Sequence, residues 1–189
     1  MEKKSRSLTV CHLVLMVLMI AFNIALIVLT LCGVKLGVDN ANPALGIAVN
    51  VLNALAFGCG IVHLRNMYGK KSAGYYKALL LLTFLGNGLV LLLYLWTAAK
   101  TSTAVIVLMA VKLLVLLMLA FWKNLGRRNT WMLFVVMTVA DFVSGVLFSA
   151  YVSEPIAAVG MVLSRLIMDG TIGLSIRGKY LDKEARRTT

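Results

Sequence analysis

The sequence predicts an all-α integral membrane protein with six transmembrane helices. Of its 189 residues, 61% are hydrophobic, and the mean hydropathy is +0.92. A soluble domain is only about 45–50% apolar, so a soluble chain of this length could not bury the excess in one core. Charged residues make up 14% of the chain and gather between long apolar runs. Lipid is therefore the solvent for which these runs are suited.

Six apolar runs are long enough to cross a bilayer, which takes about 20 helical residues. They cover roughly 8–34, 43–64, 76–98, 102–122, 131–152 and 155–176. The first run follows the basic start MEKKSR, but it exceeds a signal-peptide core of about 7–15 residues, and LTLCGVKLG has no small-x-small cleavage site. We therefore expect a retained signal-anchor helix. Pro43 and Pro155 open the second and sixth runs, where a missing N–H costs little.

Basic residues gather at four places that lie on one side of this topology. These are the N-terminus (Lys3, Lys4, Arg6), the loops HLRNMYGKKSAGYYK and WKNLGRRNTW, and the tail RGKYLDKEARRTT. The other loops hold only Lys35 and Lys100, against Asp39 and Glu154. Cytoplasmic loops carry the Lys/Arg excess, so both termini are predicted to be cytoplasmic. No organelle-targeting signal is visible, and we expect a multi-pass protein of a bacterial plasma membrane.

The net charge of +12 follows from this topology, because the charges lie beside helix ends. We expect contact with anionic lipid head groups and no nucleic-acid partner.

The chain also divides into three helical hairpins within a single domain of residues 1–189. They cover about 8–64, 76–122 and 131–176, followed by a basic cytoplasmic tail at 177–189. Internal repeats of this kind are frequent in transporters.

Aligning the hairpins brings one strongly polar residue of each helix to the same level, near the middle of its run. The first helices align Asn23, Asn87 and Asp141, and the second helices align Asn53, Lys112 and Arg165. Asn50 adds to this set, and Asp169 follows Arg165 by four residues on the same helix face.

A lone charge at the bilayer centre costs about 2.5–3.5 kcal/mol on insertion. We therefore expect these residues to face the bundle interior, with Lys112 and Arg165 opposite Asp141 and Asp169. Asp141 should bond to Arg165 or Lys112, and the asparagines should complete the hydrogen bonds.

Two functions fit such a polar layer. In the first, it binds or passes a small polar or anionic solute. The solute-binding residues would be Asn23, Asn53, Asn87, Lys112, Asp141, Arg165 and Asp169. The two cations favour a carboxylate or phosphate. In the second, the layer is structural, since an asparagine between helices contributes about 0.6–2 kcal/mol. The protein would then be a non-catalytic assembly subunit whose outer helix faces bind another membrane protein or a second copy.

An enzyme is not expected. The sequence has no Walker motif, no G-x-S-x-G and no H-E-x-x-H. His12 and His63, with Cys11 and Cys59 nearby, are the candidates for metal, haem or thiol chemistry. Neither histidine has an obvious orienting acid, so we expect no metal and no cofactor.

In architecture the chain resembles the substrate-binding S component of energy-coupling-factor vitamin transporters. Those proteins are also basic, of similar length and six-helical, with both termini inside. In that family, small residues spaced four apart on the first helix meet the coupling subunit, and AFNIA has Ala21 and Ala25 at this spacing. The resemblance implies a solute-binding subunit, and any primary transport would need a partner ATPase. The short first outer loop GVKLGVDNANPA departs from the family, which has a longer lid there.

Overall fold

The structure, a computed structural model, describes residues 2–34, 42–66, 72–96, 102–122, 125–149 and 155–185. These residues form six α-helices: α1 (Glu2–Leu31), α2 (Pro43–Arg65), α3 (Ser72–Trp96), α4 (Thr103–Phe121), α5 (Arg127–Ser149) and α6 (Pro155–Ala185). By length and composition, all six can cross a membrane. The predicted all-α fold with six transmembrane candidates is confirmed.

The first helix ends earlier than its apolar run. Gly33 has a φ of +79°, its N–H donates to the carbonyl of Thr30, and the N–H of Val34 donates to the carbonyl of Leu29. This is a Schellman motif, in which a glycine adopts the left-handed conformation and closes the last turn. The expected run to residue 34 therefore ends as a helix at Leu31.

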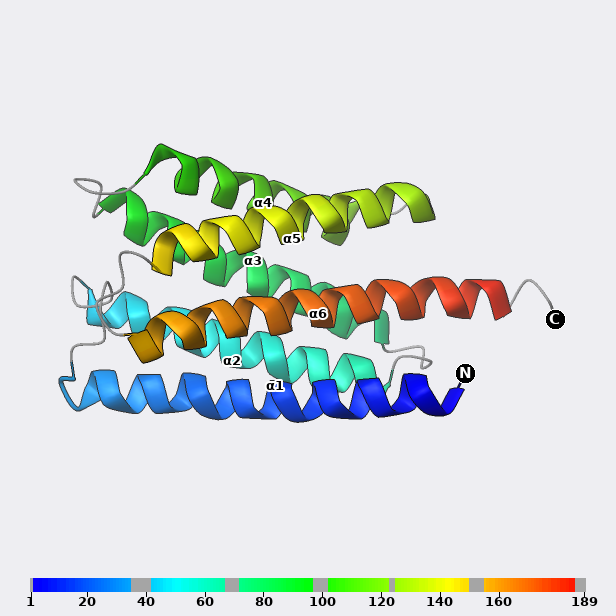
Figure 1. Cartoon of the computed structure of the whole chain (residues 1–189), viewed down its shortest axis with the longest axis horizontal. Helices are drawn as coiled ribbons and strands as arrows, with labels where there is room; N and C mark the ends of the chain where they lie inside the picture. Colours follow the sequence, from blue (N-terminus) through cyan, green and yellow to red (C-terminus); the bar gives the residue numbers. More distant parts are fainter. Residues whose placement is uncertain are drawn as a thin grey trace.

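Four helices extend beyond their apolar runs by four residues or more, all at the end of the bundle that holds the two termini (Figure 1). They are α1, α3, α5 and α6. Hydropathy marks the part of a helix suited to lipid, whereas lysine and arginine form helices well in water. The first part of the expected basic tail at 177–189 is helical, because residues 177–185 continue α6; its cytoplasmic location stays a prediction.

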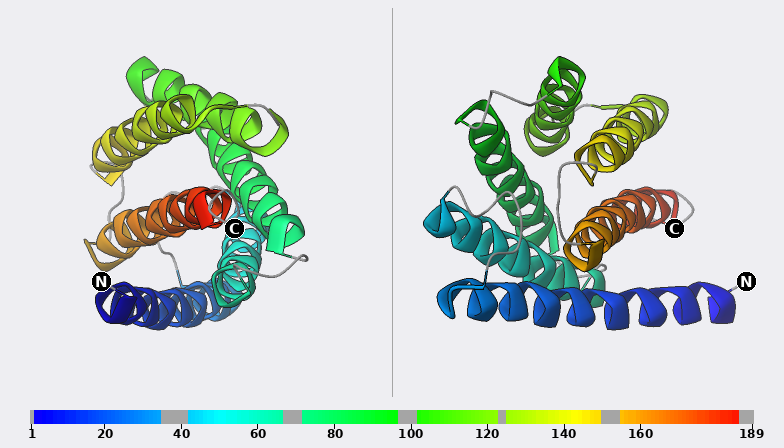
Figure 2. Two further views of the ribbon diagram at one scale, coloured as in Figure 1. Left: turned by 90° about the vertical axis from the view of Figure 1, so that its right-hand side faces the viewer. Right: turned by 60° about the vertical axis from the view of Figure 1, so that its left-hand side comes forward.

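The helices close into a ring. Each helix packs against the next one along the chain, and α6 returns to contact α1 and α2. Seen along the helices, α6 lies inside the curve formed by the other five (Figure 2). Packing of α2 on α3 and of α4 on α5 crosses the boundaries of the expected hairpins. The division into three repeats stays a prediction.

Two clusters of buried apolar side chains lie at different levels along the bundle. The larger one includes Leu116 on α4 and Met168 on α6. The smaller one is built on Val105 and Met109 of α4, with Met161 of α6 packed against it. Lys112 and Arg165 therefore lie between the two clusters along their helices. A polar level separates two apolar levels, as expected for residues near the middle of a span.

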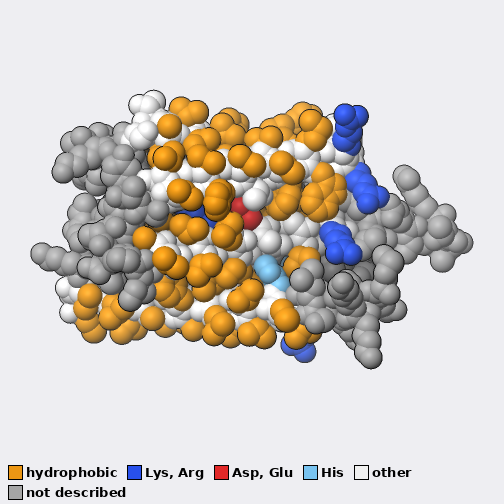
Figure 3. Space-filling model, viewed as in Figure 1, with side chains coloured by type: hydrophobic (Ala, Val, Ile, Leu, Met, Phe, Trp, Pro, Cys, Tyr) orange, Lys and Arg blue, Asp and Glu red, His pale blue; other side chains and the backbone are white. Residues whose placement is uncertain are grey.

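Hydrophobic side chains are spread over the middle of the described face, and basic side chains gather at the end with the termini (Figure 3). The exposed basic residues described there are Arg65, Lys77, Arg127, Arg128 and Arg177. This is the charge distribution from which a cytoplasmic location of both termini is predicted. The prediction also depends on the few charges in the loops at the other end of the bundle. These residues lie outside the described ranges: Lys35, Lys100, Asp39 and Glu154.

Candidate functional site

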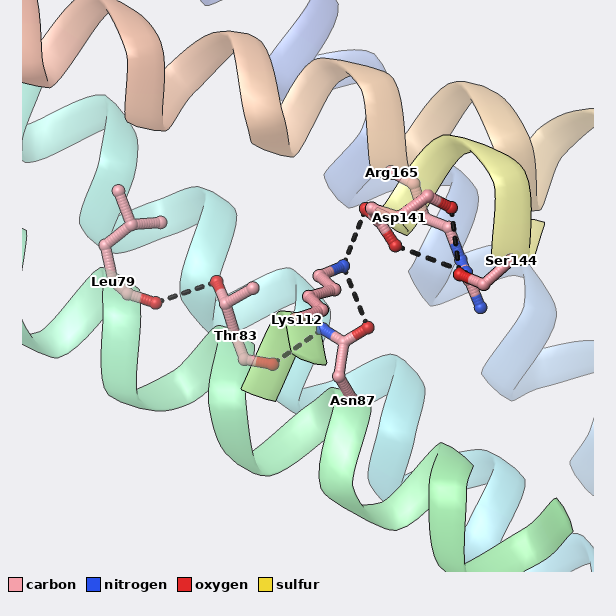
Figure 4. Close-up of polar contacts among 7 residues, drawn as sticks. All are labelled: Leu79, Thr83, Asn87, Lys112, Asp141, Ser144 and Arg165. Atoms are coloured by element: carbon pink, nitrogen blue, oxygen red, sulfur yellow. Dashed lines mark hydrogen bonds and ion pairs between the residues drawn. The ribbon is translucent and has the colours of Figure 1, made fainter. Parts of the chain in front are cut away.

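Asp141 on α5 contacts basic side chains from two other helices (Figure 4). The Lys112 Nζ on α4 lies 2.6 Å from Asp141 Oδ2. The Arg165 Nη1 on α6 lies 3.2 Å from Asp141 Oδ1. The side chain of Asp141 is fully buried, and those of Lys112 and Arg165 are 2% and 11% exposed. The expected pairing of Asp141 is confirmed, and both cations share its carboxylate.

The two ion pairs use different oxygens of the Asp141 carboxylate. Arg165 Nη1 donates a hydrogen bond to Asp141 Oδ1. Lys112 Nζ is closer to the carboxylate than Arg165 Nη1 is, and it forms an ion pair with Oδ2. The attraction between two such charges is strong where water is excluded.

Asn87 and Ser144 extend the network to four helices. The Asn87 Oδ1 on α3 accepts from Lys112 Nζ at 3.0 Å. The Asn87 amide in turn donates to the carbonyl of Thr83 at 2.7 Å. On α5, Ser144 Oγ donates to the carbonyl of Asp141 at 3.0 Å and accepts from Arg165 Nη1 at 3.2 Å. Each cation therefore has a second polar partner besides Asp141: Lys112 bonds to Asn87, and Arg165 bonds to Ser144.

The segment DFVSG on α5 shapes the Arg165 side of the site. Ser144 lies three residues after Asp141, and Gly145 lies four after it, so both share one helix face with the carboxylate. A Cβ at Gly145 would lie 3.3 Å from Arg165 Cδ. The glycine therefore lets the arginine side chain approach the α5 backbone. Sequence analysis missed both residues, although their spacing from Asp141 was visible.

Asp169 lies one turn after Arg165 on α6 and is 3% exposed. Its Oδ1 has no hydrogen-bond partner in the described residues. A narrow space of about 180 Å³ between α5 and α6 is lined by Asp141, Gly145, Arg165 and Asp169, together with apolar side chains. That volume includes open space at the surface, and the site has no room for a water molecule, so it is a crevice and not a formed solute pocket. Acidic atoms are visible in the middle of the hydrophobic face (Figure 3).

The other predicted residues do not join this network. Asn23 is buried on α1, but its amide donates to the carbonyl of Met19 in the same helix, at 2.7 Å. On α2, the Asn53 oxygen lies 3.2 Å from the position of a Cβ at Gly86 of α3. Asn50 is buried on the same helix. Among the asparagines, the expected role of completing the hydrogen bonds holds for Asn87 only.

The two histidines meet different helices. His12 Nε2 lies 2.9 Å from Thr171 Oγ1 on α6. The threonine hydroxyl donates to the carbonyl of Ile167, so it accepts from His12. The His63 ring packs against Tyr76 of α3, with 5.3 Å between centroids. Over the described ranges, no three His, Cys, Asp or Glu side chains are placed to hold a metal ion.

No protein-family model, curated protein or solved structure matches this chain. The fold is that of a polytopic integral membrane protein, and its buried ion-pair network is the feature from which a function can be argued. The architectural resemblance to S components gains no support from these comparisons.

Asn87→Ala is expected to destabilise the bundle by about 1–3 kcal/mol, because the buried Lys112 ammonium loses an acceptor that nothing replaces. Equilibrium unfolding in mixed micelles would measure the change. Thr83→Val is the control on the same helix, since the Thr83 hydroxyl bonds only to the backbone carbonyl of Leu79. Its cost should be at most about 1 kcal/mol. Equal losses for the two variants would contradict a specific role of Asn87.

Proposed function

We propose that the protein binds a small anionic solute at the Asp141 network and passes it across the membrane or to a partner subunit. The observation that supports this best is that two cations from different helices, Lys112 buried and Arg165 partly buried, share a single buried carboxylate. A carboxylate or phosphate of a solute offers the same oxygen ligands as Asp141. Such a solute could replace Asp141 on Lys112 or Arg165 without leaving either cation unpaired.

The cost of the network argues for more than packing. Apolar side chains of similar volume are often as stable as a buried ion pair, or more stable by about 1–4 kcal/mol. Stability alone therefore does not require Lys112, Asp141 and Arg165. Ionisable residues inside membrane spans usually mark the path of an ion or a solute.

The position of the network supports the same proposal. Asn87 pairs with Lys112 across 25 residues, and Asp141 pairs with Arg165 across 24. Each pair joins the two helices of one expected hairpin, at the positions that the repeat alignment made equivalent. Lys112 and Asp141 then join the two hairpins. Solute sites of transporters lie near the midplane between repeats, and separation of these hairpins would uncover both cations.

Partner binding is part of the proposal. The chain has no nucleotide-binding motif, so transport driven by ATP would require another subunit. Ala21 and Ala25 are exposed on α1. They are the positions at which the resemblance to S components would place the coupling subunit.

A structural role is the second candidate, and the small volume near the network favours it. The crevice between α5 and α6 has no room for a water molecule, whereas a ligand pocket is usually a cavity of about 300–1,000 Å³. In this role the network would fix the packing of α3, α4, α5 and α6 in an accessory subunit. A solute site requires that the bundle open to bind its ligand.

A native mass spectrum of the gently solubilised protein tests the proposal. We expect a monomer near 20.6 kDa with a reproducible small anionic adduct. The adduct should be absent from a folded variant that carries Lys112→Met, Asp141→Leu, Arg165→Met and Asp169→Asn together. The control Arg127→Gln with Arg128→Gln removes two exposed cations and should keep the adduct. A bare homo-oligomer, or a complex with another protein that survives in the fourfold variant, would support the structural role.

A further inference from the structure

We propose that Asp169 is the proton-binding group of this site, and that its protonation sets the charge with which the site meets an anion. This inference rests on the proposed function and adds a coupling ion to it. It begins from the one carboxylate of the described network that does not share in the ion pairs of Lys112 and Arg165.

The surroundings of Asp169 are unusual for an ionised side chain. It is 3% exposed, and its Oδ1 has no hydrogen-bond partner over the residues that the structure describes. It lines the narrow space between α5 and α6 together with Asp141 and Arg165. Burying a carboxylate without hydrogen bonds is costly, and taking up a proton removes that cost. The same proton leaves the ion pairs of Asp141 intact.

The charges of the site then give a simple balance. Lys112 and Arg165 carry two positive charges, and Asp141 and Asp169 carry two negative charges when both are ionised. The ionised site is therefore neutral, and protonation of Asp169 makes it singly positive. A net charge inside a membrane is costly, so a monoanion should bind best to the protonated site. By reciprocity, the bound anion should favour the bound proton.

The proton step breaks and forms one bond only. A proton from water at the membrane surface adds to a carboxylate oxygen of Asp169 and forms an O–H bond. On release, this bond breaks, the electron pair stays on the oxygen, and the proton returns to water. The ionised Asp169 then has two counter-charges, Lys112 of α4 and, one turn away on its own helix, the Arg165 guanidinium. It competes with Asp141 for that guanidinium.

Other titratable groups lie on the elements packed against α6. Lys112 of α4 and Asp141 of α5 face the site itself. On α1, His12 bonds to Thr171 and lies close to Gly170, where a Cβ would be 2.8 Å from its Cε1. The titratable residues described on the half of α2 nearer the termini are Cys59, His63 and the exposed Arg65. Because His12 reaches α6 at Gly170, the residue after Asp169, it requires a control.

Infrared difference spectra between acidic and alkaline pH, recorded on the full chain in lipid nanodiscs without added anion, test the proton site. We expect a carboxylic-acid C=O band that is lost in Asp169→Asn. The amide is isosteric with the protonated acid, so this variant should fold. The control His12→Gln should keep the band. Persistence of the full band in Asp169→Asn would overturn the proposal.

A second measurement separates this inference from the proposed function. Acetate or inorganic phosphate is added to weakly buffered protein, and proton uptake is followed with a pH indicator. We expect about one proton per bound acetate in the wild type and none in Asp169→Asn. Acetate or phosphate binding without proton uptake by the wild type would overturn the inference and leave the proposed function standing. An Asp169 band without binding of either anion supports the proton site and contradicts the proposed function.

Discussion

Asp141→Asn is expected to lower the free energy of unfolding by about 3–5 kcal/mol, the cost of breaking a buried ion pair from one side. The amide carries no charge, so Lys112 and Arg165 would lie close together without the carboxylate that they share. Their repulsion would act in a region that excludes water, where charges interact strongly. Unfolding in mixed micelles, followed by the loss of helical signal, would measure the change.

A double variant is the matched control. Asp141→Asn together with Lys112→Met removes one charge of each sign and leaves Arg165 with Asp169, four residues apart on α6. We expect the double variant to recover most of the lost stability, because an apolar replacement of a buried pair is often neutral or stabilising. If Asp141→Asn lowered the free energy of unfolding by less than about 1 kcal/mol, the ion pair would contribute no more than an exposed salt bridge, and the prediction would be wrong. A double variant as unstable as the single one would show that charge balance is not the cause.

Gly60→Leu is expected to prevent folding or to cost at least about 3 kcal/mol, at the upper end of overpacking effects. A Cβ at Gly60 of α2 would lie 2.6 Å from Met16 Cε of α1 and 2.9 Å from Thr171 Cγ2 of α6. It would also lie 3.6 Å from Leu79 Cδ1 of α3. Three helices therefore close around this backbone position. Met16 Cε ends a flexible side chain and can move aside, whereas Thr171 is held by its hydrogen bonds to His12 and Ile167, so a leucine would push α6 away from α2.

Gly58→Leu on the same helix is the control, because a Cβ at Gly58 has nothing within 4 Å. Both variants add the same side chain to the same helix, so a difference between them reports packing at Gly60 alone. The monodisperse fraction after heating, measured by size-exclusion chromatography, would compare them. Equal heat resistance would mean that the helices do not meet closely at Gly60.

The parts of the fold that the sequence predicted are those that the membrane constrains most strongly. A span must be a helix of about 20 apolar residues, because lipid offers no partner to backbone groups. The six helices could therefore be located from apolar runs alone. The pairing of Asp141 with Lys112 and Arg165 could be predicted from charge, because an unpaired charge at this depth is costly.

The remaining features depend on rotation and distance, which hydropathy does not encode. Asn23 satisfies its amide with a carbonyl of its own helix, so its depth in the span did not bring it to the network. Ser144 and Gly145 resemble ordinary small residues of a transmembrane helix. Their role follows from the approach of Arg165 to α5, and that approach depends on how α5 and α6 pack.

The closure of the ring by α6 bears on how the chain is made. During synthesis the N-terminal helices enter the membrane first. In the described part of the chain, α1 packs mainly against α2 and α6. The hydrogen bond of His12 to Thr171 can therefore form only after a further 159 residues have been synthesised. Asp141 can meet Lys112 before Arg165 emerges, so the first ion pair can assist insertion of α4 and α5. The last helix then completes the polar network and the packing of α1. A nascent chain that lacks α6 would leave Lys112, Asp141 and the inner face of α1 uncovered, which would mark it as incompletely folded.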